Sequence, residues 1–405
     1  MIVLKEKKDC CGCSACAQRC PKLCITMQSD NEGFLYPCIN TEQCIDCGLC
    51  EKVCPVINRG ETTRPIVAYA AMNKNEEIRL ASSSGGIFTL LAEAVINEGG
   101  VVFGVKFNES WQAVFDYTET IEGLAPFRGS KYVQAIVGNA YKTAEGFLKA
   151  GRKVLFTGTP CQIAGLNKYL RKDYENLLTV DIICHGAPSP LVWKEYVAEL
   201  IRAKRGAGKN SVSLSLNDEP VLTGISFRDK TNSWKKYCFR ATFAASKAAK
   251  NTVSEPEYIL ETFNKNKFMQ GFLRDIYLRP SCYSCPAKNG ISNSDITIGD
   301  FWGIEKHLPE MDDDKGTSAV LVNSHQAEDF INRLPLHKTV ADYESIVTGN
   351  SALVKSVARN SYTDLFWKTF ASHGIDAILL VCKKMQPSII NRLFQKIKRK
   401  VKTYK

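Results

Sequence analysis

Residues 10–21 read CCGCSACAQRCP and residues 44–55 read CIDCGLCEKVCP, and these two stretches decide how the chain begins to fold. Each stretch holds a run of four cysteines separated by two, two and three residues, and each run is followed by proline. Eleven of the 17 cysteines fall between Cys10 and Cys54. A short segment is therefore built around cysteine chemistry, which in a reducing compartment indicates metal binding more often than disulfides.

The spacing of both runs is typical of ferredoxins that hold two [4Fe-4S] clusters, in which the fourth cysteine of each run binds the other cluster. The predicted ligand sets are Cys10, Cys13, Cys16 and Cys54 for one cluster, and Cys44, Cys47, Cys50 and Cys20 for the second. Small residues between the ligands leave room for backbone N-H groups to donate to the sulfurs. Zinc is disfavoured because structural zinc sites use separated Cys-x2-Cys pairs.

Three further cysteines of this segment, Cys11, Cys24 and Cys38, lie outside the pattern. Cys11 adjoins Cys10 and fails the spacing. We expect all three to be small buried hydrophobic residues rather than ligands.

The whole chain has 405 residues, which predicts two or three domains, and 44% hydrophobic with 23% charged residues, as in ordinary globular proteins. Much of the net charge of +11 lies in Lys383–Lys405. The preferred interpretation is a solvated basic tail, and the alternative is peripheral contact with an anionic membrane.

The first residues, Met1–Asp9, do not resemble a signal peptide and no run of 18 apolar residues occurs, so we expect a cytoplasmic protein. No DNA-binding element is recognisable, so nucleic acid is not an expected partner.

A polar stretch, Ile57–Pro65, reads as a linker, and strands then alternate with helices. The predicted strands are 66–71, 101–107, 111–117, 154–157, 179–183 and 296–298, and the predicted helices are 87–97 and 141–150. The expected fold is an α+β ferredoxin-like two-cluster module followed by an α/β domain with a mostly parallel or mixed sheet.

Two short segments could bind an anion. ASSSGG (81–86) precedes a predicted helix, whose N-H groups and dipole suit a phosphate or a flavin pyrophosphate, although a serine-rich helix cap without a ligand would look the same. RGSKY (128–132) offers two cations and a hydroxyl as a phosphate clamp, or is an exposed turn.

The later cysteines suggest a third site. Cys161 and Cys184 follow predicted strands, and Cys282 with Cys285 forms a Cys-x2-Cys pair, so the four could converge at one edge of a parallel sheet. A third [4Fe-4S] cluster, zinc, a redox-active dithiol and unconnected buried cysteines all remain open. His185 could be a catalytic proton donor or base, or a hydrogen-bonded neighbour of a metal site. Asp300, Phe301 and Trp302 could line a flavin pocket, but we expect the two aromatic residues to fill core.

The motifs SSSGGIF, RGSKY, TGTPCQIAGL, DIICHG, CYSCP and SDITIGDFWG, in this order, resemble the beta-subunit family of coenzyme F420 hydrogenases and formate dehydrogenases over roughly residues 66–310. The resemblance implies a bound FAD and a [4Fe-4S] cluster beside it at Cys161, Cys184, Cys282 and Cys285. It also favours phosphate or flavin binding by Ser83, Ser84, Gly85, Gly86, Arg128 and Lys131.

The expected domains are then a ferredoxin-type domain (1–60), the two parts of a flavin domain (66–150 and 151–310), and a helical extension with a basic tail (311–405). The expected function is that of an iron-sulfur flavoprotein oxidoreductase. It would pass electrons between a redox partner protein, such as a ferredoxin, and a small molecule, either coenzyme F420 or another organic substrate. The alternative is an electron-transfer subunit of a larger complex without a substrate site of its own.

Overall fold

The first sixty residues form short elements joined by cysteine-rich loops, in a computed structural model that describes residues 1–207, 220–244 and 256–385. The elements are η1 (Lys7–Asp9), α1 (Ala15–Arg19), β1 (Ile25–Ser29), β2 (Leu35–Ile39) and α2 (Leu49–Lys52). Both helices begin after a residue in the left-handed conformation, Ser14 or Gly48, where the cysteine loop turns into the helix. We refer to residues 1–60 as the cysteine module; it has the expected α+β character, and its kinship with ferredoxins stays a prediction.

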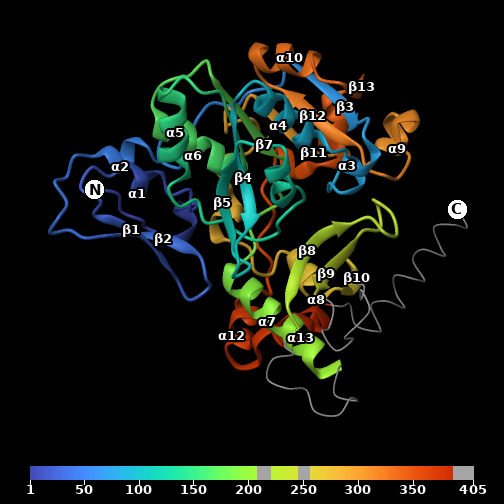
Figure 1. Ribbon diagram of the computed structural model, residues 1–405. Helices are drawn as coiled ribbons and strands as arrows, with labels where there is room; N and C mark the ends of the chain where they lie inside the picture. The colour runs from blue at the N-terminus through green and yellow to red at the C-terminus, as the bar shows by residue number, and fades with distance from the viewer. Residues whose placement is uncertain (208–219, 245–255, 386–405) are drawn as a thin grey trace, which may run out of the picture.

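The centre of the molecule is an eight-stranded mixed sheet (Figure 1). Its strands, from one edge to the other, are β13 (Leu336–Val340), β3 (Val67–Asn73), β12 (Ser318–Val322), β11 (Ile296–Asp300), β7 (Leu177–Ile182), β6 (Val154–Gly158), β4 (Val101–Phe107) and β5 (Ala113–Thr118). The four strands from β11 to β4 are parallel, and every other pairing is antiparallel. The expectation of an α/β domain with a mixed sheet is confirmed.

Alternating side chains of the parallel strands are buried on opposite faces of the sheet, as the period of two in a strand requires. On one face Val102, Leu155 and Val180 pack against helix α4 (Ile87–Asn97). On the other face Val101, Phe103, Val154 and Phe156 pack against α5 (Ala140–Lys149) and α6 (Pro160–Leu170). The cysteine module packs on this second face, because Cys11, Cys13, Ala15 and Val53 belong to the same hydrophobic cluster. Figure 1 shows the module, in blue, beside α5 and α6.

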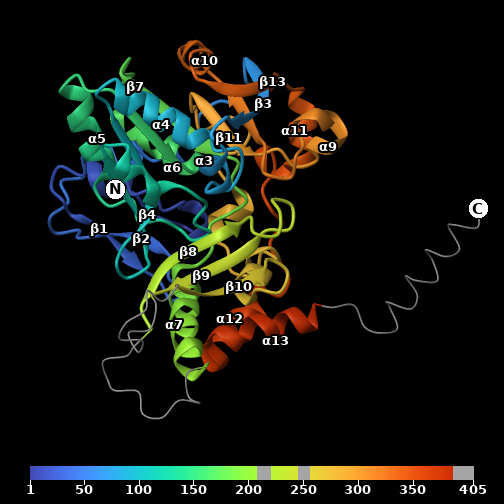
Figure 2. The same cartoon turned by 45° about the vertical axis from the view of Figure 1, so that its right-hand side comes forward.

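A second lobe lies below the central sheet in Figure 2, where it is built around a small antiparallel sheet. Its elements are α7 (Pro190–Ala207), β8 (Leu222–Asp229), β9 (Cys238–Phe243), β10 (Glu257–Thr262), α8 (Lys267–Phe272), α12 (Thr363–His373), η6 (Gly374–Asp376) and α13 (Ala377–Lys384). Its core is aromatic, with Trp193, Phe227, Phe239 and Phe268 almost completely buried. This lobe was not predicted from the sequence.

The remaining described helices are short and lie around the central sheet. They are α3 (Glu76–Leu80), η2 (Glu122–Phe127), η3 (Pro280–Ser284), α9 (Ile304–His307), η4 (Pro309–Met311), α10 (His325–Asn332), α11 (Tyr343–Gly349) and η5 (Ser351–Leu353). The strands and helices predicted between residues 66 and 183 are confirmed, with shifts of at most two residues at their ends. The structure also has α3, η2 and α6 in this range, which were not predicted.

The segment 311–405 is not only a helical extension, which corrects the sequence-based expectation. Strands β12 and β13 belong to the central sheet and enclose β3 between them. All five residues of β12 are buried. Such a strand shows no alternation of polar and apolar residues, which is why its sequence did not distinguish it from a helix. The basic tail itself lies outside the described residues.

One described stretch, Thr363–Lys384, is long and apolar enough to cross a membrane, which by itself is weak evidence for a membrane span. The stretch is divided at Gly374, where the backbone leaves the helical conformation and α12 ends. Phe366, Ile378 and Val381 are buried in the aromatic core of the second lobe. Packing within the protein thus accounts for part of its apolar character, since 33% of the stretch is buried.

Candidate metal and cofactor sites

The inner pocket lies between the first cysteine run and the end of the second. It has an empty volume of about 330 Å³ and is lined by Cys10, Cys13, Cys16 and Cys54, together with Cys11. These four are the first predicted ligand set. Burial is the largest cause that raises the pKa of Cys16, to about 12, so an isolated thiolate is disfavoured here without a positive partner.

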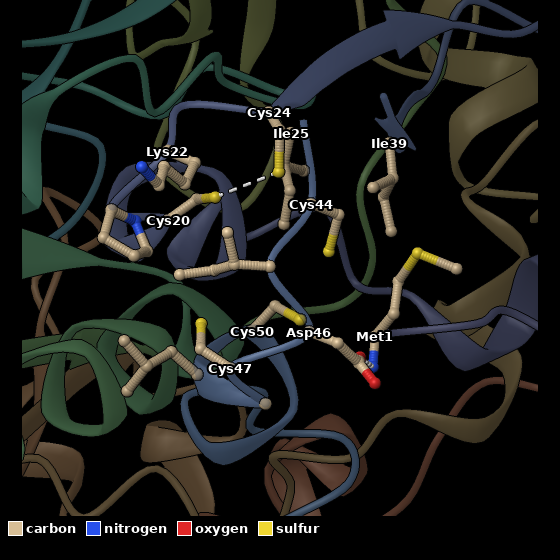
Figure 3. Close-up of a pocket in the computed structure, with 14 residues that line it drawn as sticks. Met1, Cys20, Lys22, Cys24, Ile25, Ile39, Cys44, Asp46, Cys47 and Cys50 are labelled. Atoms are coloured by element: carbon tan, nitrogen blue, oxygen red, sulfur yellow. Dashed lines mark hydrogen bonds and ion pairs between the residues drawn. The ribbon is translucent and has the colours of Figure 1, made fainter. Parts of the chain in front are cut away.

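The outer pocket, shown in Figure 3, has an empty volume of about 360 Å³. It is lined by Cys20, Cys44, Cys47 and Cys50, the second predicted set, and also by Cys24. The sulfur atoms of Cys20 and Cys24 are 3.4 Å apart. Cys47 is exposed, so this pocket reaches the surface. The structure therefore groups the eight cysteines of the two runs as the spacing predicts, with Cys20 and Cys54 exchanged between the runs.

Backbone N-H groups are directed at several of these sulfurs. Gly12 N donates to Cys10 Sγ over 3.4 Å, and Ile2 N donates to Cys50 Sγ over 3.3 Å. Such donors are the usual outer contacts of iron-sulfur clusters. Each pocket is lined by cysteine sulfurs that accept hydrogen bonds from backbone N-H groups. This donor set fits an iron-sulfur cluster. In the described part of the chain, no three His, Cys, Asp or Glu side chains are placed to hold a single metal ion.

The three cysteines outside the pattern differ in their surroundings. Cys11 and Cys24 are buried, as expected, but each lines a pocket. Cys38 is exposed on β2, so its predicted burial is wrong. Cys38 pairs with Thr26 of β1, which is exposed as well, so both side chains face solvent.

The four later cysteines come together at the carboxyl edge of the parallel strands. Cys161 lies in the first turn of α6 after β6, Cys184 follows β7, and Cys282 and Cys285 lie in or next to η3. Because β6 and β7 are parallel neighbours, their ends meet at one edge. We call this group the core cysteine site.

The thiols of the core cysteine site influence one another electrostatically. The pKa of Cys184 is raised to about 12, chiefly by burial; the charge of Lys288 opposes this shift, and the charges of Cys161 and Cys285 add to it. Burial also raises the pKa of Cys282, with Cys184, Cys161 and Cys285 adding to the effect. Ala187 N donates to Cys282 Sγ over 3.3 Å, which repeats the N-H to sulfur pattern of the module. The four side chains are thus close enough for their charges to interact, and a shared ligand stays a prediction.

His185, next to Cys184, is hydrogen-bonded to Asp275. His185 Nε2 lies 2.6 Å from Asp275 Oδ1, and the ring edge meets Phe272. Asp275 adopts a left-handed backbone conformation with φ of 58°, a cost that a single residue usually bears only in a constrained site. Sequence reasoning singled out His185 but not its partner, since nothing local relates two residues so far apart in the chain.

The two proposed anion-binding segments are neighbours in space. Ser130 N donates to Ser83 Oγ over 2.8 Å. The hydroxyl of Ser84 donates to Thr317 O and does not cap α4. Gly86 is the N-cap residue of α4 and no side chain caps this helix, so its first N-H groups remain available to a ligand.

The glycine at position 85 is required by close packing. A Cβ atom there would lie 2.5 Å from Ala71 O and 2.9 Å from Ser318 N. Gly85 N donates to Ser318 Oγ over 2.9 Å, which fixes the segment against β12. Gly85 is thus a packing residue that brings α4 close to the sheet.

Arg128 and Lys131 carry charges that no described carboxylate neutralises. Arg128 Nε donates to Thr89 Oγ1 over 3.2 Å, and Lys131 Nζ donates to the carbonyls of Pro126 and Arg128. Burial lowers the pKa of Lys131 to about 7. Arg128, together with Lys131 when it is protonated, has the charge and the donors to bind a phosphate group beside this helix N-terminus.

The IGDFWG motif lies at the junction of the central sheet and the second lobe. Phe301 is fully buried, as expected. Trp302 stacks on Trp234 with ring centres 4.9 Å apart, and Asp300 Oδ2 accepts from the buried Arg228 over 2.8 Å. Neither Arg228 nor Trp234 was singled out from the sequence, because each lies alone in a strand or loop without a motif.

Comparison with known families and structures adds one firm result. The family described as the C-terminal region of the coenzyme F420 hydrogenase/dehydrogenase beta subunit matches residues 151–342. A chain of the F420-reducing [NiFe] hydrogenase complex from Methanosarcina barkeri is similar at 15% identity and a TM-score of 0.44, over 74% of this chain and 98% of that one. A likeness this remote supports no conclusion about fold or activity. No curated protein matches significantly.

The matched residues contain the core cysteine site, His185 and most strands of the central sheet. The match starts later than the resemblance judged from the motifs and extends beyond residue 310, through β12 and β13. Residues 151–342 of the chain are therefore similar to the C-terminal region of the coenzyme F420 hydrogenase/dehydrogenase beta subunit.

Proposed function

We propose that the protein is an iron-sulfur flavoprotein oxidoreductase. Electrons would pass through two [4Fe-4S] sites in the cysteine module, a third at the core cysteine site, and an FAD, to or from a small organic molecule. The observation that carries the proposal is the grouping of twelve cysteines into three sets of four, one set around each pocket and one at the sheet edge. Clusters supply single-electron steps, and a flavin supplies the two-electron step that a small organic substrate requires.

The three sets adjoin one another, which supports a continuous path. Cys16 of the inner pocket lies close enough to Cys50 of the outer pocket for the charge of Cys50 to raise its pKa. On the other side, the thiol of Cys11 lies near those of Cys13 and Cys161, which both shift its pKa. The outer pocket is the set nearest solvent, so it is the proposed contact point for a redox partner protein.

For FAD, the proposed contacts are the N-terminus of α4, Ser83, Ser84, Gly85, Gly86, Arg128 and Lys131. Segment 128–134 supports this assignment because it connects the N-terminus of α4 with the cysteine module. Ser130 contacts Ser83 at one end, and Gln134 Nε2 donates to Cys11 O over 3.1 Å at the other. Segment 128–134, which would hold the pyrophosphate, thus also contacts the loop of Cys11.

His185 is the proposed catalytic histidine. If Asp275 is ionised, Nε2 carries the proton of the neutral ring and Nδ1 is left as an acceptor. The hydrogen bond then orients the ring beside the core cysteine site. Its role toward the substrate is to accept a hydrogen bond at Nδ1.

The alternative is an electron-transfer subunit whose substrate site lies in a partner. The description of the matched family as a beta subunit favours this reading. The isolated chain decides between the two: turnover of coenzyme F420 or another small molecule with an artificial electron donor supports an enzyme. Full reduction of the cofactors without turnover of any tested molecule supports a subunit. A cytoplasmic location and a membrane role for the basic tail remain predictions.

The proposal is tested by anaerobic purification and measurement of iron, acid-labile sulfide and flavin per chain. We expect about twelve irons, since each cluster holds about four, and one FAD. About eight irons without flavin would support the two clusters of the cysteine module and contradict both the third cluster and the FAD. Stoichiometric zinc in place of four irons would contradict the cluster at the core cysteine site.

A further inference from the structure

A buried arginine joins the cysteine module to the rest of the protein. Arg279 is 1% exposed. Its Nε donates to Cys10 O over 2.8 Å and its Nη2 donates to Leu35 O over 2.9 Å, both in the module. Its Nη1 donates to Gln134 Oε1 over 2.8 Å. One guanidinium group therefore connects a loop and strand β2 of the module to the segment that leads from the proposed flavin contacts.

The loop that Arg279 holds fits closely around it. Gly12 has a φ of +74°, and a Cβ atom there would lie 2.7 Å from Gln134 Nε2 and 2.9 Å from Arg279 Nη1. Gln134 Nε2 also donates to Cys11 O. Residues 10–12 are thus fixed from the outside by two side chains of the larger domain, at the point where Cys10 and Cys11 enter the inner pocket.

The charge of Arg279 has no carboxylate partner among the described residues. The guanidinium carbon lies 4.3 Å from the centre of the Tyr36 ring and 5.5 Å from that of Phe34, and its donors meet carbonyl and amide oxygens. A cation taken out of water is costly unless an opposite charge is near. The groups near it that can carry negative charge include the cysteine sites, and also Asp30 and Glu32, which lie around Tyr36.

Arg279 lies next to both the core cysteine site and the inner pocket. Cys282 N donates to Arg279 O over 2.9 Å, so the arginine precedes the Cys-x2-Cys pair by one turn. Its charge also lowers the pKa of Cys161, although hydrogen bonding with Cys11 and burial raise that pKa overall. The inner pocket is on its other side, through Cys10.

We propose that Arg279 is a positioning residue that docks the loop 10–12 between the inner pocket and the core cysteine site, and that its positive charge raises the reduction potentials of both clusters. This inference rests on the proposed function. A one-electron transfer between the two sites moves one negative charge and no atoms, and the reduced form at either site carries the greater negative charge. A fixed buried cation stabilises that form, and net charge near a cluster is one of the factors that set its potential.

The experiment compares three variants of the full chain, each purified anaerobically, by iron content and by redox titration followed with EPR. In Arg279→Gln, which removes the charge, we expect two of the three cluster potentials to shift to lower values while the outer one stays unchanged. In Arg279→Lys, which keeps the charge, we expect potentials close to the wild type. Gln134→Met is the matched control, because it removes two hydrogen bonds of the same junction without removing a charge, and should leave the potentials unchanged.

Unchanged potentials in Arg279→Gln would overturn the inference, and so would an equal shift in the Gln134→Met control. If Arg279→Gln loses its iron, Arg279→Lys decides: wild-type potentials support the role of the charge, and lowered potentials contradict it. Failure of the proposed function is a separate result, since it would already show as missing iron in the wild-type protein.

Discussion

The proposed cluster at the core cysteine site can be tested directly by substituting single cysteines. In Cys161→Ala we expect the iron content to fall from about twelve to about eight per chain, because a cluster that loses one of four thiolates is bound weakly. Cys382→Ala is the control, since Cys382 is buried in the aromatic core of the second lobe and lines neither pocket. Iron and sulfide assays with EPR measure the outcome, and twelve irons in the Cys161 variant would remove this residue from the ligand set.

Lys131 gives a prediction on pH. Burial lowers its pKa from an ordinary lysine value to about 7, so the folded protein holds this proton less tightly than the unfolded chain does. Between pH 7 and pH 10 the unfolded state binds more protons at this position, and the stability contributed by Lys131 therefore rises with pH. A bound phosphate acts in the opposite sense, because it favours the charged amine.

We accordingly expect the affinity for FAD to rise as the pH falls from 8.5 through 7. Fluorescence titration of the flavin-free protein measures it, with Lys131→Met losing this pH dependence. An identical profile in the wild type and the variant would show that Lys131 does not contact the phosphate.

The residues that could be predicted from the sequence are those with local spacing. The first three cysteines of each run line one pocket because they lie on one short loop, and the exchange of Cys20 and Cys54 follows the spacing of two-cluster ferredoxins. Arg279 was missed because one arginine before a proline has no distinguishing pattern, and its acceptors Cys10 O and Leu35 O are distant in the chain. Asp275 was missed for the same reason.

Among the elements, the segment before α4 allows a test of how closely the chain packs against the central sheet at Gly85. In Gly85→Ala the new methyl group would collide with Ala71 O, so we expect a loss of about 1–3 kcal/mol in the free energy of unfolding. Gly146→Ala is the matched control, since Gly146 lies within α5 with open space around it, and should gain about 0.5–1 kcal/mol. Urea unfolding followed by circular dichroism measures both, and equal stability of the two variants would contradict the close approach.

Elements were predictable where the hydrophobic period was clear. Helix α4 and strand β4 were found at their observed bounds, since an amphipathic helix and a strand after a glycine pair show distinct patterns. The second lobe was missed because its small sheet is held together by aromatic residues from distant segments, such as Trp193 and Phe268. Its strands have no strong signal of their own.

At the scale of the whole molecule, the linker and the junction make separate contributions to holding the module. Thr63 Oγ1 donates to Gly290 O over 3.1 Å, and Arg64 pairs with Glu344 on the surface. Exposed contacts of this kind contribute little. The buried contacts of Arg279 and the packing of α1 against α6 are the stronger attachment.

We therefore expect the module to remain bound after the linker is cut. A site-specific protease sequence inserted after Gly60 allows the cut, and size-exclusion chromatography under anaerobic conditions shows whether both fragments elute together. Inserting the same sequence after Lys172, in an exposed turn between α6 and β7, controls for the insertion. Separate elution of the module would mean that the linker, and not the junction, holds it.

The position of β3 has a consequence for how the protein is made. This strand leaves the ribosome early, yet both of its neighbours, β12 and β13, are synthesised only when translation has reached residue 340. Until then a buried strand with two open edges must wait in a partly made chain, where exposed strands are prone to aggregate. Efficient production should therefore depend on chaperones that shield nascent β3, and a translational pause before residue 318 should lower the yield of folded protein.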